Sequence, residues 1–249
     1  MLYAAMTFWL LVIVLTAWGV HRLWSGMIRA KALNTVLLPG TLVAQIGHVL
    51  GLLVTGATIS NTTLFKDDES GAPETTPDPQ PRIPIVGPVV IGLLPLLACA
   101  TGIYLVARFF GGPILSRLHV STVGPMLPLS LGGAFQMLRD LVSLVESIVS
   151  AVRGADFHHW KTWVFVYLLT CLTVRAAPFP GTLRGSLGAI VILGIGGAAT
   201  GSLFDVADPR VQNAWAVLNL SVATLLLLLI VSLLIRGAVN VIKLIREGG

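Results

Sequence analysis

The chain has 249 residues, of which 55% are apolar and only 11% charged, and its mean hydropathy is +0.88. Soluble domains carry about 25% charged residues. The composition therefore excludes a soluble globular enzyme, together with collagen-like, disordered and disulfide-framework proteins. The net charge of +5 comes from basic residues in short segments beside hydrophobic runs, which is typical of membrane topology signals and argues against nucleic-acid binding.

Six runs are long and apolar enough to be transmembrane helices of about 20 residues. They are Tyr3–Val20, Val36–Ile59, Ile85–Phe109, Trp160–Val174, Gly185–Phe204 and Val211–Ile235. The first run lacks the basic start and the cleavage site of a signal peptide, so we expect a retained helix. The sequence predicts an all-α polytopic membrane protein with six to seven transmembrane helices, forming a single transmembrane domain over residues 1–249.

Two polar segments lie outside these runs, one between the second and the third and one after the last. Asn61–Pro84 is acidic and contains five prolines, which predicts that residues 61–84 form an exposed outer loop rather than a folded module. Residues 236–249 carry Lys243 and Arg246 at helical spacing, which suits a basic cytoplasmic tail at the inner headgroups.

The segment Val123–Val152 could span, re-enter or lie on the membrane surface, because it carries Arg139, Asp140 and Glu146. Lys and Arg gather on the cytoplasmic side of membrane proteins. With a crossing here and the N-terminus outside, ten of these residues fall inside and five outside; without a crossing the asymmetry inverts. We therefore favour a crossing, with the C-terminus in the cytoplasm. Arg139 with Asp140 or Glu146 would then form an intramembrane polar cluster, and the alternative is that the charged half is interfacial.

The second run contains a polar pair, Gln45 and His48, close after Pro39-Gly40. Polar side chains inside a hydrophobic helix are costly, so an intramembrane site is the first hypothesis. The alternative is a histidine that bonds to a neighbouring helix, with glycines that allow close packing.

The stretch Pro39-Gly40-Thr41-Leu42-Val43-Ala44-Gln45-Ile46-Gly47-His48 resembles the metal helix of the site-2 protease family, which are intramembrane zinc metalloproteases. That helix has Pro-Gly near its start and then His-Glu-x-x-His. Ala44 and Gln45 stand where the family has the first His and the Glu, and His48 stands at the second His. Two His at i and i+4 clamp one zinc and the Glu acts as general base. Ala44 has no donor atom, and the neutral Gln45 cannot take a proton from zinc-bound water.

A second, weaker resemblance to the same family covers Tyr167 to Gly185, where Thr182 stands at the position of an aspartate that is the third ligand. The alternative is an ordinary Pro/Gly turn between two spans. A catalytic zinc needs three protein ligands and an open position. The resemblance therefore implies a site-2-protease-like core that holds no metal and has no peptidase activity.

Three functional hypotheses follow. The first is a catalytically inactive, site-2-protease-like structural or regulatory subunit of a membrane complex in a bacterial cytoplasmic membrane. Its partners would be the lipid bilayer and other membrane proteins, with no cofactor, although a bound lipid is left open. The second is a transporter or channel component that uses Arg139, Asp140 and Glu146. The third, and least favoured, is an unusual hydrolase that recruits His119 and His158.

The remaining chemistry-bearing residues have simpler interpretations. Cys99 and Cys171 both fall inside apolar runs, so we expect small buried packing residues. His158-His159-Trp160 stands at a run boundary, which is typical of an interfacial belt rather than of a metal site.

Overall fold

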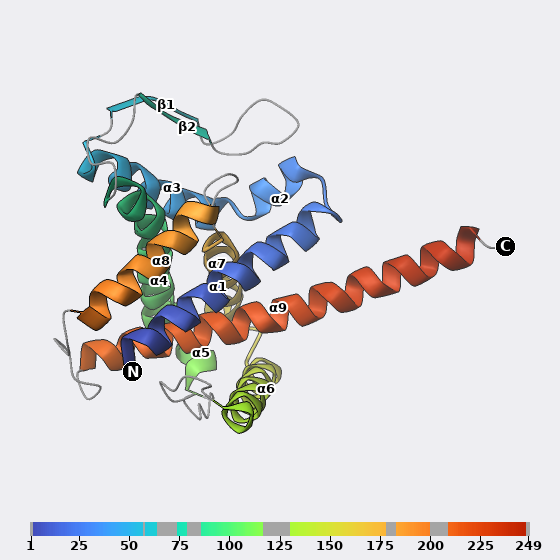
Figure 1. The fold of residues 1–249 in the computed structure, drawn as a ribbon. Helices are drawn as coiled ribbons and strands as arrows, with labels where there is room; N and C mark the ends of the chain where they lie inside the picture. The colour runs from blue at the N-terminus through green and yellow to red at the C-terminus, as the bar shows by residue number, and fades with distance from the viewer. Residues whose placement is uncertain are drawn as a thin grey trace.

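The computed structural model describes residues 2–56, 58–63, 74–78, 86–116, 130–177, 183–199 and 209–247. These residues fold mainly as helices, and each of the six apolar runs overlaps a helix, although the last residues of the second run lie in a strand, β1 (Figure 1). The elements in chain order are α1 (Leu2–Ser25), α2 (Ala30–Val36), α3 (Leu38–Val54), β1 (Thr58–Thr63), β2 (Glu74–Asp78), α4 (Val86–Phe110), α5 (Gly112–Leu115), α6 (Leu131–Arg153), α7 (Trp160–Arg175), α8 (Leu183–Ala199) and α9 (Pro209–Glu247).

Three of the described helices are long and apolar enough to cross a membrane: Ala4–Ser25, Gly87–Phe110 and Val211–Val241. The pair α2 and α3 would add a fourth span if the two helices count as one. The 16 residues of α7 extend only about 24 Å, less than the ~30 Å hydrocarbon core. The structure thus indicates an integral membrane protein with three to four candidate spans, and the six to seven spans stay a prediction.

A bend of 81° separates α2 from α3. Pro39 causes it, because proline has no N–H to donate to the preceding turn and its ring clashes with the carbonyl four residues earlier. The same residue is well tolerated in the first turn of the new helix, where it lies. The break leaves carbonyl groups at the end of α2 that side chains of other helices can use.

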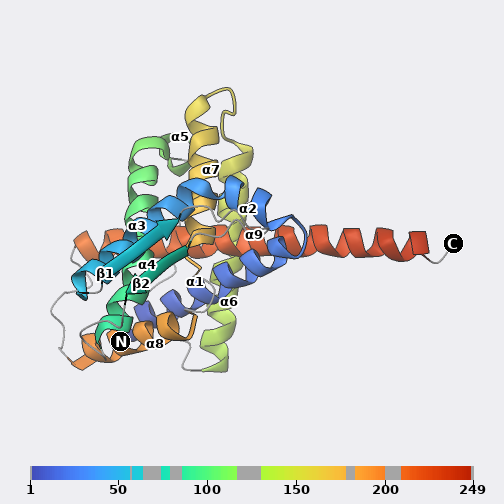
Figure 2. The same ribbon diagram turned by 90° about the horizontal axis from the view of Figure 1, so that it is seen from above.

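The first and last helices, α1 and α9, lie side by side and run in the same direction (Figures 1 and 2). Near their starts the rings of Trp9 and Trp215 meet edge to face, with centroids 6.2 Å apart. Near the end of α1, the Trp24 Nε1 donates a hydrogen bond of 2.7 Å to Ser232 Oγ. The topology derived from the charge count also predicts that these two runs are parallel. Which side of the membrane is cytoplasmic stays a prediction.

In contrast, α4 and α7 run antiparallel. The Phe110 ring at the end of α4 packs on Trp160 at the start of α7, with centroids 5.9 Å apart. Gly102, two turns earlier, faces Leu172 near the end of α7. The helix between them, α6, is not among the candidate spans of the described residues, which favours the interfacial alternative for α6 over the crossing that the charge count favoured.

A short β-hairpin lies partly within the segment 61–84, which was expected to form an outer loop. Strands β1 and β2 pair antiparallel, from Thr58 opposite Asp78 to Thr63 opposite Glu74. The other residues between 57 and 85 lie outside the described part of the chain.

The main core forms where α1, α3, α4, α7 and α9 meet. It contains Trp9, Ala44, Cys99, Cys171 and Trp215, all buried. Cys99 and Cys171 are both buried, as predicted.

Candidate functional site

Ala44, Gln45 and His48, which the resemblance places at the positions of a metal motif, lie together on α3. Ala44 and Gln45 are buried, with 1% and 4% of their surface exposed, and His48 is half-buried. Gln45 and His48 both take part in interactions with their surroundings. Thr182, the position of the third ligand in the resemblance, lies outside the described residues.

One face of α3 consists of Gly40, Ala44, Gly47 and Gly51, at spacings of three and four residues, and we call it the small-residue face. This face packs directly on the backbones of α7 and α4. A Cβ on Gly40 would overlap the Cys171 carbonyl group, and one on Gly47 would lie 2.7 Å from Pro95 Cα. The glycines are therefore explained by close helix packing.

The position where the family has its first zinc ligand belongs to this packed face. Ala44 is part of the hydrophobic core, so an imidazole at position 44 would point into the contact of α3 with α4 and α7. The donor set does not fit a zinc ion, because position 44 has no donor atom and Gln45 is neutral. In the described part of the chain no group of three or more His, Cys, Asp or Glu side chains gathers.

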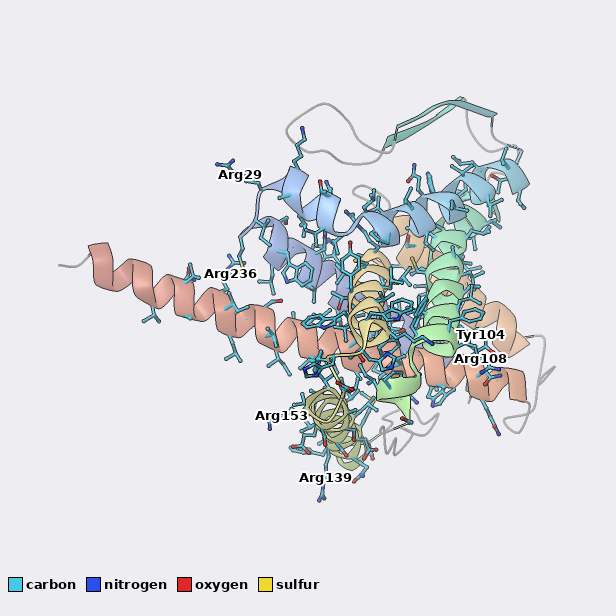
Figure 3. The ribbon with its side chains drawn as sticks, turned by 180° about the vertical axis from the view of Figure 1, so that it is seen from behind. Arg29, Tyr104, Arg108, Arg139, Arg153 and Arg236 are labelled. Atoms are coloured by element: carbon cyan, nitrogen blue, oxygen red, sulfur yellow. The ribbon has the colours of Figure 1, made fainter. Side chains whose placement is uncertain are left out.

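The charged residues of α6 are not brought together. Arg139 and Glu146 are exposed, and Asp140 is half-buried and accepts a 3.0 Å hydrogen bond from Gln136 Nε2. Figure 3 shows Arg139 pointing away from the other helices. Among the described residues none of the three forms an ion pair.

Of the two histidines considered for an unusual hydrolase, His119 and His158, the structure describes one. His119 lies outside the described residues. His158 is exposed just before α7, and its backbone N–H and Nδ1 lie 2.9 and 3.2 Å from Asp156 Oδ1. These bonds hold the pKa of the Asp156 carboxyl below its ordinary value, the backbone bond contributing most. The pair orders the turn into α7, at a distance from α3 in the chain and in the fold (Figure 1).

Sequence reasoning missed a polar junction between α2, the start of α3 and α7, in which Asn34, Cys171 and Arg175 are buried and Tyr167 is 45% exposed. It contains Asn34, the Val36 carbonyl group, Tyr167, Cys171 and Arg175. The Tyr167 hydroxyl donates to the Val36 carbonyl at 2.8 Å, and Cys171 Sγ lies 3.4 Å from the same oxygen. These bonds use a carbonyl that the break before Pro39 leaves free of a helical partner.

At this polar junction Arg175 is a buried cation, with 8% of its surface exposed. Its Nη2 donates to Asn34 Oδ1, 141 residues earlier in the chain. Its Nε has no hydrogen-bond partner among the described residues. The sequence analysis counted Arg175 only as a topology charge, and no local pattern indicates that it meets Asn34.

Two cavities open on the other side of the core. The larger, of about 670 Å³, lies between α1, α4, α8 and α9, and the smaller, of about 470 Å³, lies between α4, α5, α6 and α9. Tyr104, Asn213 and Val217 line both, so the two adjoin. We call them together the double cavity. It includes no residue of α3.

A comparison of this chain with protein-family models, with curated proteins and with solved structures finds no match. The resemblance to site-2 proteases therefore stays a prediction that rests on the residues quoted above.

Proposed function

We propose that this chain is a non-catalytic integral membrane protein that serves as a structural or regulatory subunit of a membrane complex. In this proposal α3 is the relic of a site-2-protease-like metal helix, used for packing. The observation that carries it is the small-residue face. Three glycines and Ala44 bring the backbone of α3 against α4 and α7, which supports a structural use of the motif helix.

The transporter alternative receives no comparable support. It needs Arg139, Asp140 and Glu146 to line a shared path, and in the structure Arg139 and Glu146 are exposed on a helix that is itself no candidate span. We therefore do not propose it.

Metal analysis tests the non-catalytic half of the proposal. The protein is purified in mild detergent with zinc present, alongside His48→Ala and the rebuilt variant Ala44→His/Gln45→Glu. We expect substoichiometric zinc in all three, because position 44 faces the packed core. One zinc per chain that is lost in His48→Ala would overturn the proposal.

Native mass spectrometry tests the subunit half. The chain is extracted from its own membranes with a mild detergent and measured without overexpression. We expect a fixed stoichiometry with at least one other membrane protein. A chain that is released only as a monomer or a homo-oligomer would contradict the assignment as a subunit.

A further inference from the structure

We infer that the end of the molecule where α1, α2 and α9 meet is a binding surface for the headgroups of anionic phospholipids. Four basic residues carry this surface, and we call them the basic cluster: Arg22, Arg29, Lys31 and Arg236. The inference does not depend on the proposed function, because the basic cluster shares no residue with α3.

Two segments that are far apart in the chain bring the basic cluster together. The hydrogen bond from Trp24 to Ser232, which are 208 residues apart, holds the end of α1 beside α9. Further along α9, Arg236 reaches the turn that follows α1, where its Nη1 would lie 4.0 Å from a Cβ added at Gly26. Arg29 is the residue before α2, and Figure 3 shows Arg29 and Arg236 on the same side of the molecule.

The basic cluster has no acidic partner in the part of the chain that the structure describes. All four side chains are exposed, and none of them forms an ion pair with a described residue. The acidic side chains that the structure describes belong to α6 and to the turn before α7: Asp140, Glu146 and Asp156. In contrast, α2 lies against the end of α7, where Asn34 meets Arg175. The positive charge of the basic cluster is therefore available to an anion.

Apolar side chains beside the basic cluster indicate a membrane surface rather than a partner in solution. Met27 and Ile28, in the turn between α1 and α2, are 37% and 47% exposed. The guanidinium carbon of Arg22 lies 5.2 Å from the centroid of the Trp18 ring. Because the turn follows directly on the candidate span Ala4–Ser25, α1 as a transmembrane helix places it at the depth of the headgroups. An exposed apolar turn between basic residues suits the boundary between headgroups and acyl chains.

The chemistry of the basic cluster favours a phosphate headgroup with a net negative charge. A guanidinium group donates two parallel hydrogen bonds to a phosphate, and three of the four residues are arginines. Basic residues clustered beside a transmembrane helix attract acidic lipids, and each Lys or Arg adds to the attraction. Phosphatidylglycerol is therefore favoured over phosphatidylcholine, in which a quaternary ammonium group neutralises the phosphate.

Native mass spectrometry with defined probes tests the inference. The delipidated protein in detergent is titrated with phosphatidylglycerol, with phosphatidylcholine of the same acyl chains, or with glycerol phosphate, which has no acyl chain. We expect phosphatidylglycerol to bind more tightly than phosphatidylcholine, by about fivefold for each basic residue that it engages. This preference should weaken as the ionic strength rises, because salt screens exposed charges.

Matched variants locate the surface. Arg22→Gln/Arg236→Gln removes two charges and should bind phosphatidylglycerol about 25-fold more weakly than the wild type. Arg139→Gln/Arg153→Gln removes two exposed arginines from α6, which also carries acidic residues, and should leave the affinity unchanged. Arg22→Lys/Arg236→Lys keeps both charges and should keep most of the preference for phosphatidylglycerol over phosphatidylcholine.

A second pair, Arg29→Gln/Lys31→Gln, repeats the test without the contact of Arg22 with Trp18, in case the loss of that contact weakens the fold. Equal binding of phosphatidylglycerol and phosphatidylcholine would overturn the inference and leave annular lipid only. An equal loss of affinity in the α6 pair would show a general effect of net charge and would overturn it too. Displacement of phosphatidylglycerol by glycerol phosphate at the same concentration would assign the basic cluster to a soluble anion instead of a lipid.

Discussion

At the residue scale, the polar junction poses a defined energetic problem. The Arg175 guanidinium is buried and donates to one described acceptor, the neutral Asn34 amide. Removing a hydrogen-bond partner from a buried charge costs more than the bond is worth, because the charge stays desolvated. Replacing both groups by apolar ones of similar size avoids that cost.

We therefore expect Asn34→Ala to lower the free energy of unfolding by about 2 kcal/mol. Arg175→Met should cost less, and the double variant should recover most of the loss caused by Asn34→Ala. Unfolding in mixed micelles, followed by circular dichroism, measures all three. Additive losses in the double variant would show that the two side chains do not depend on each other.

The glycines of the small-residue face allow a matched test of packing. A Cβ at Gly47 would lie 2.6 Å from the Leu94 carbonyl oxygen and 2.7 Å from Pro95 Cα, so two backbones would have to separate. Gly188 on α8 has nothing within 4 Å of the same position. Gly47 and Gly188 both lie within helices, and they differ in the space that is open to an added Cβ.

Gly47→Ala should destabilise the protein by about 1–3 kcal/mol through overpacking. Gly188→Ala should be neutral or stabilise it by up to about 1 kcal/mol, because alanine favours helix more than glycine does. Thermal unfolding in one detergent compares them. A neutral Gly47→Ala would mean that α3 does not pack on α4 as described, and would remove the main support for the proposed function.

At the element scale, α6 has two separate apolar faces. Leu144, Ile148 and Ala151 are buried near its end. A stripe of Leu131, Phe135, Leu138 and Val142 is exposed along its first half, up to 87% at Leu131. An apolar stripe at this spacing, on a helix that also carries Arg139, Asp140 and Glu146, is typical of a helix that lies in the membrane interface.

Spin labels on single cysteines measure its depth, in a background with Cys99→Ala and Cys171→Ala. A label at Phe135→Cys should report a shallow position near the headgroups. The control label at Leu229→Cys, in the middle of the candidate span of α9, should report a deep one. A Phe135→Cys label as deep as the control would restore the transmembrane crossing that the charge count favoured.

The comparison of sequence with structure separates local from long-range information. The apolar runs coincide with helices except at Val36–Ile59, which the structure divides at Pro39, because burial in hydrocarbon or in a helix bundle depends on each segment's own composition. The glycines after Pro39 indicate close packing, which is one of the two alternatives that the sequence leaves open for this helix. The pairing of Arg175 with Asn34 depends on a contact between distant helices, and no pattern in the chain encodes it. The role of Thr182 stays a prediction.

At the scale of the whole molecule, α9 exceeds what the bundle needs. Its 39 residues extend about 58 Å, nearly twice the ~30 Å hydrocarbon core. Trp24 and Ser232 mark the last hydrogen bond between α1 and α9. Beyond this point α9 continues away from the other helices (Figures 1 and 2). Leu234 and Val241 are 68% and 55% exposed, and a Cβ added at Gly237 would meet no atom of another helix within 4 Å.

The last part of α9, residues 233–247, is where the proposed subunit would meet its complex, and a truncation separates folding from assembly. Deleting residues 237–249 keeps Ser232 and Arg236, so the free energy of unfolding should change by less than about 0.5 kcal/mol, as for surface changes in general. The stoichiometric partner should be lost in native mass spectrometry. The variant Lys243→Gln/Arg246→Gln keeps the apolar residues of this segment. It should retain the partner if apolar packing holds the complex together. A truncated chain that keeps its partner would place the assembly surface on another helix, and one that unfolds at a much lower temperature would show that the last part of α9 belongs to the bundle.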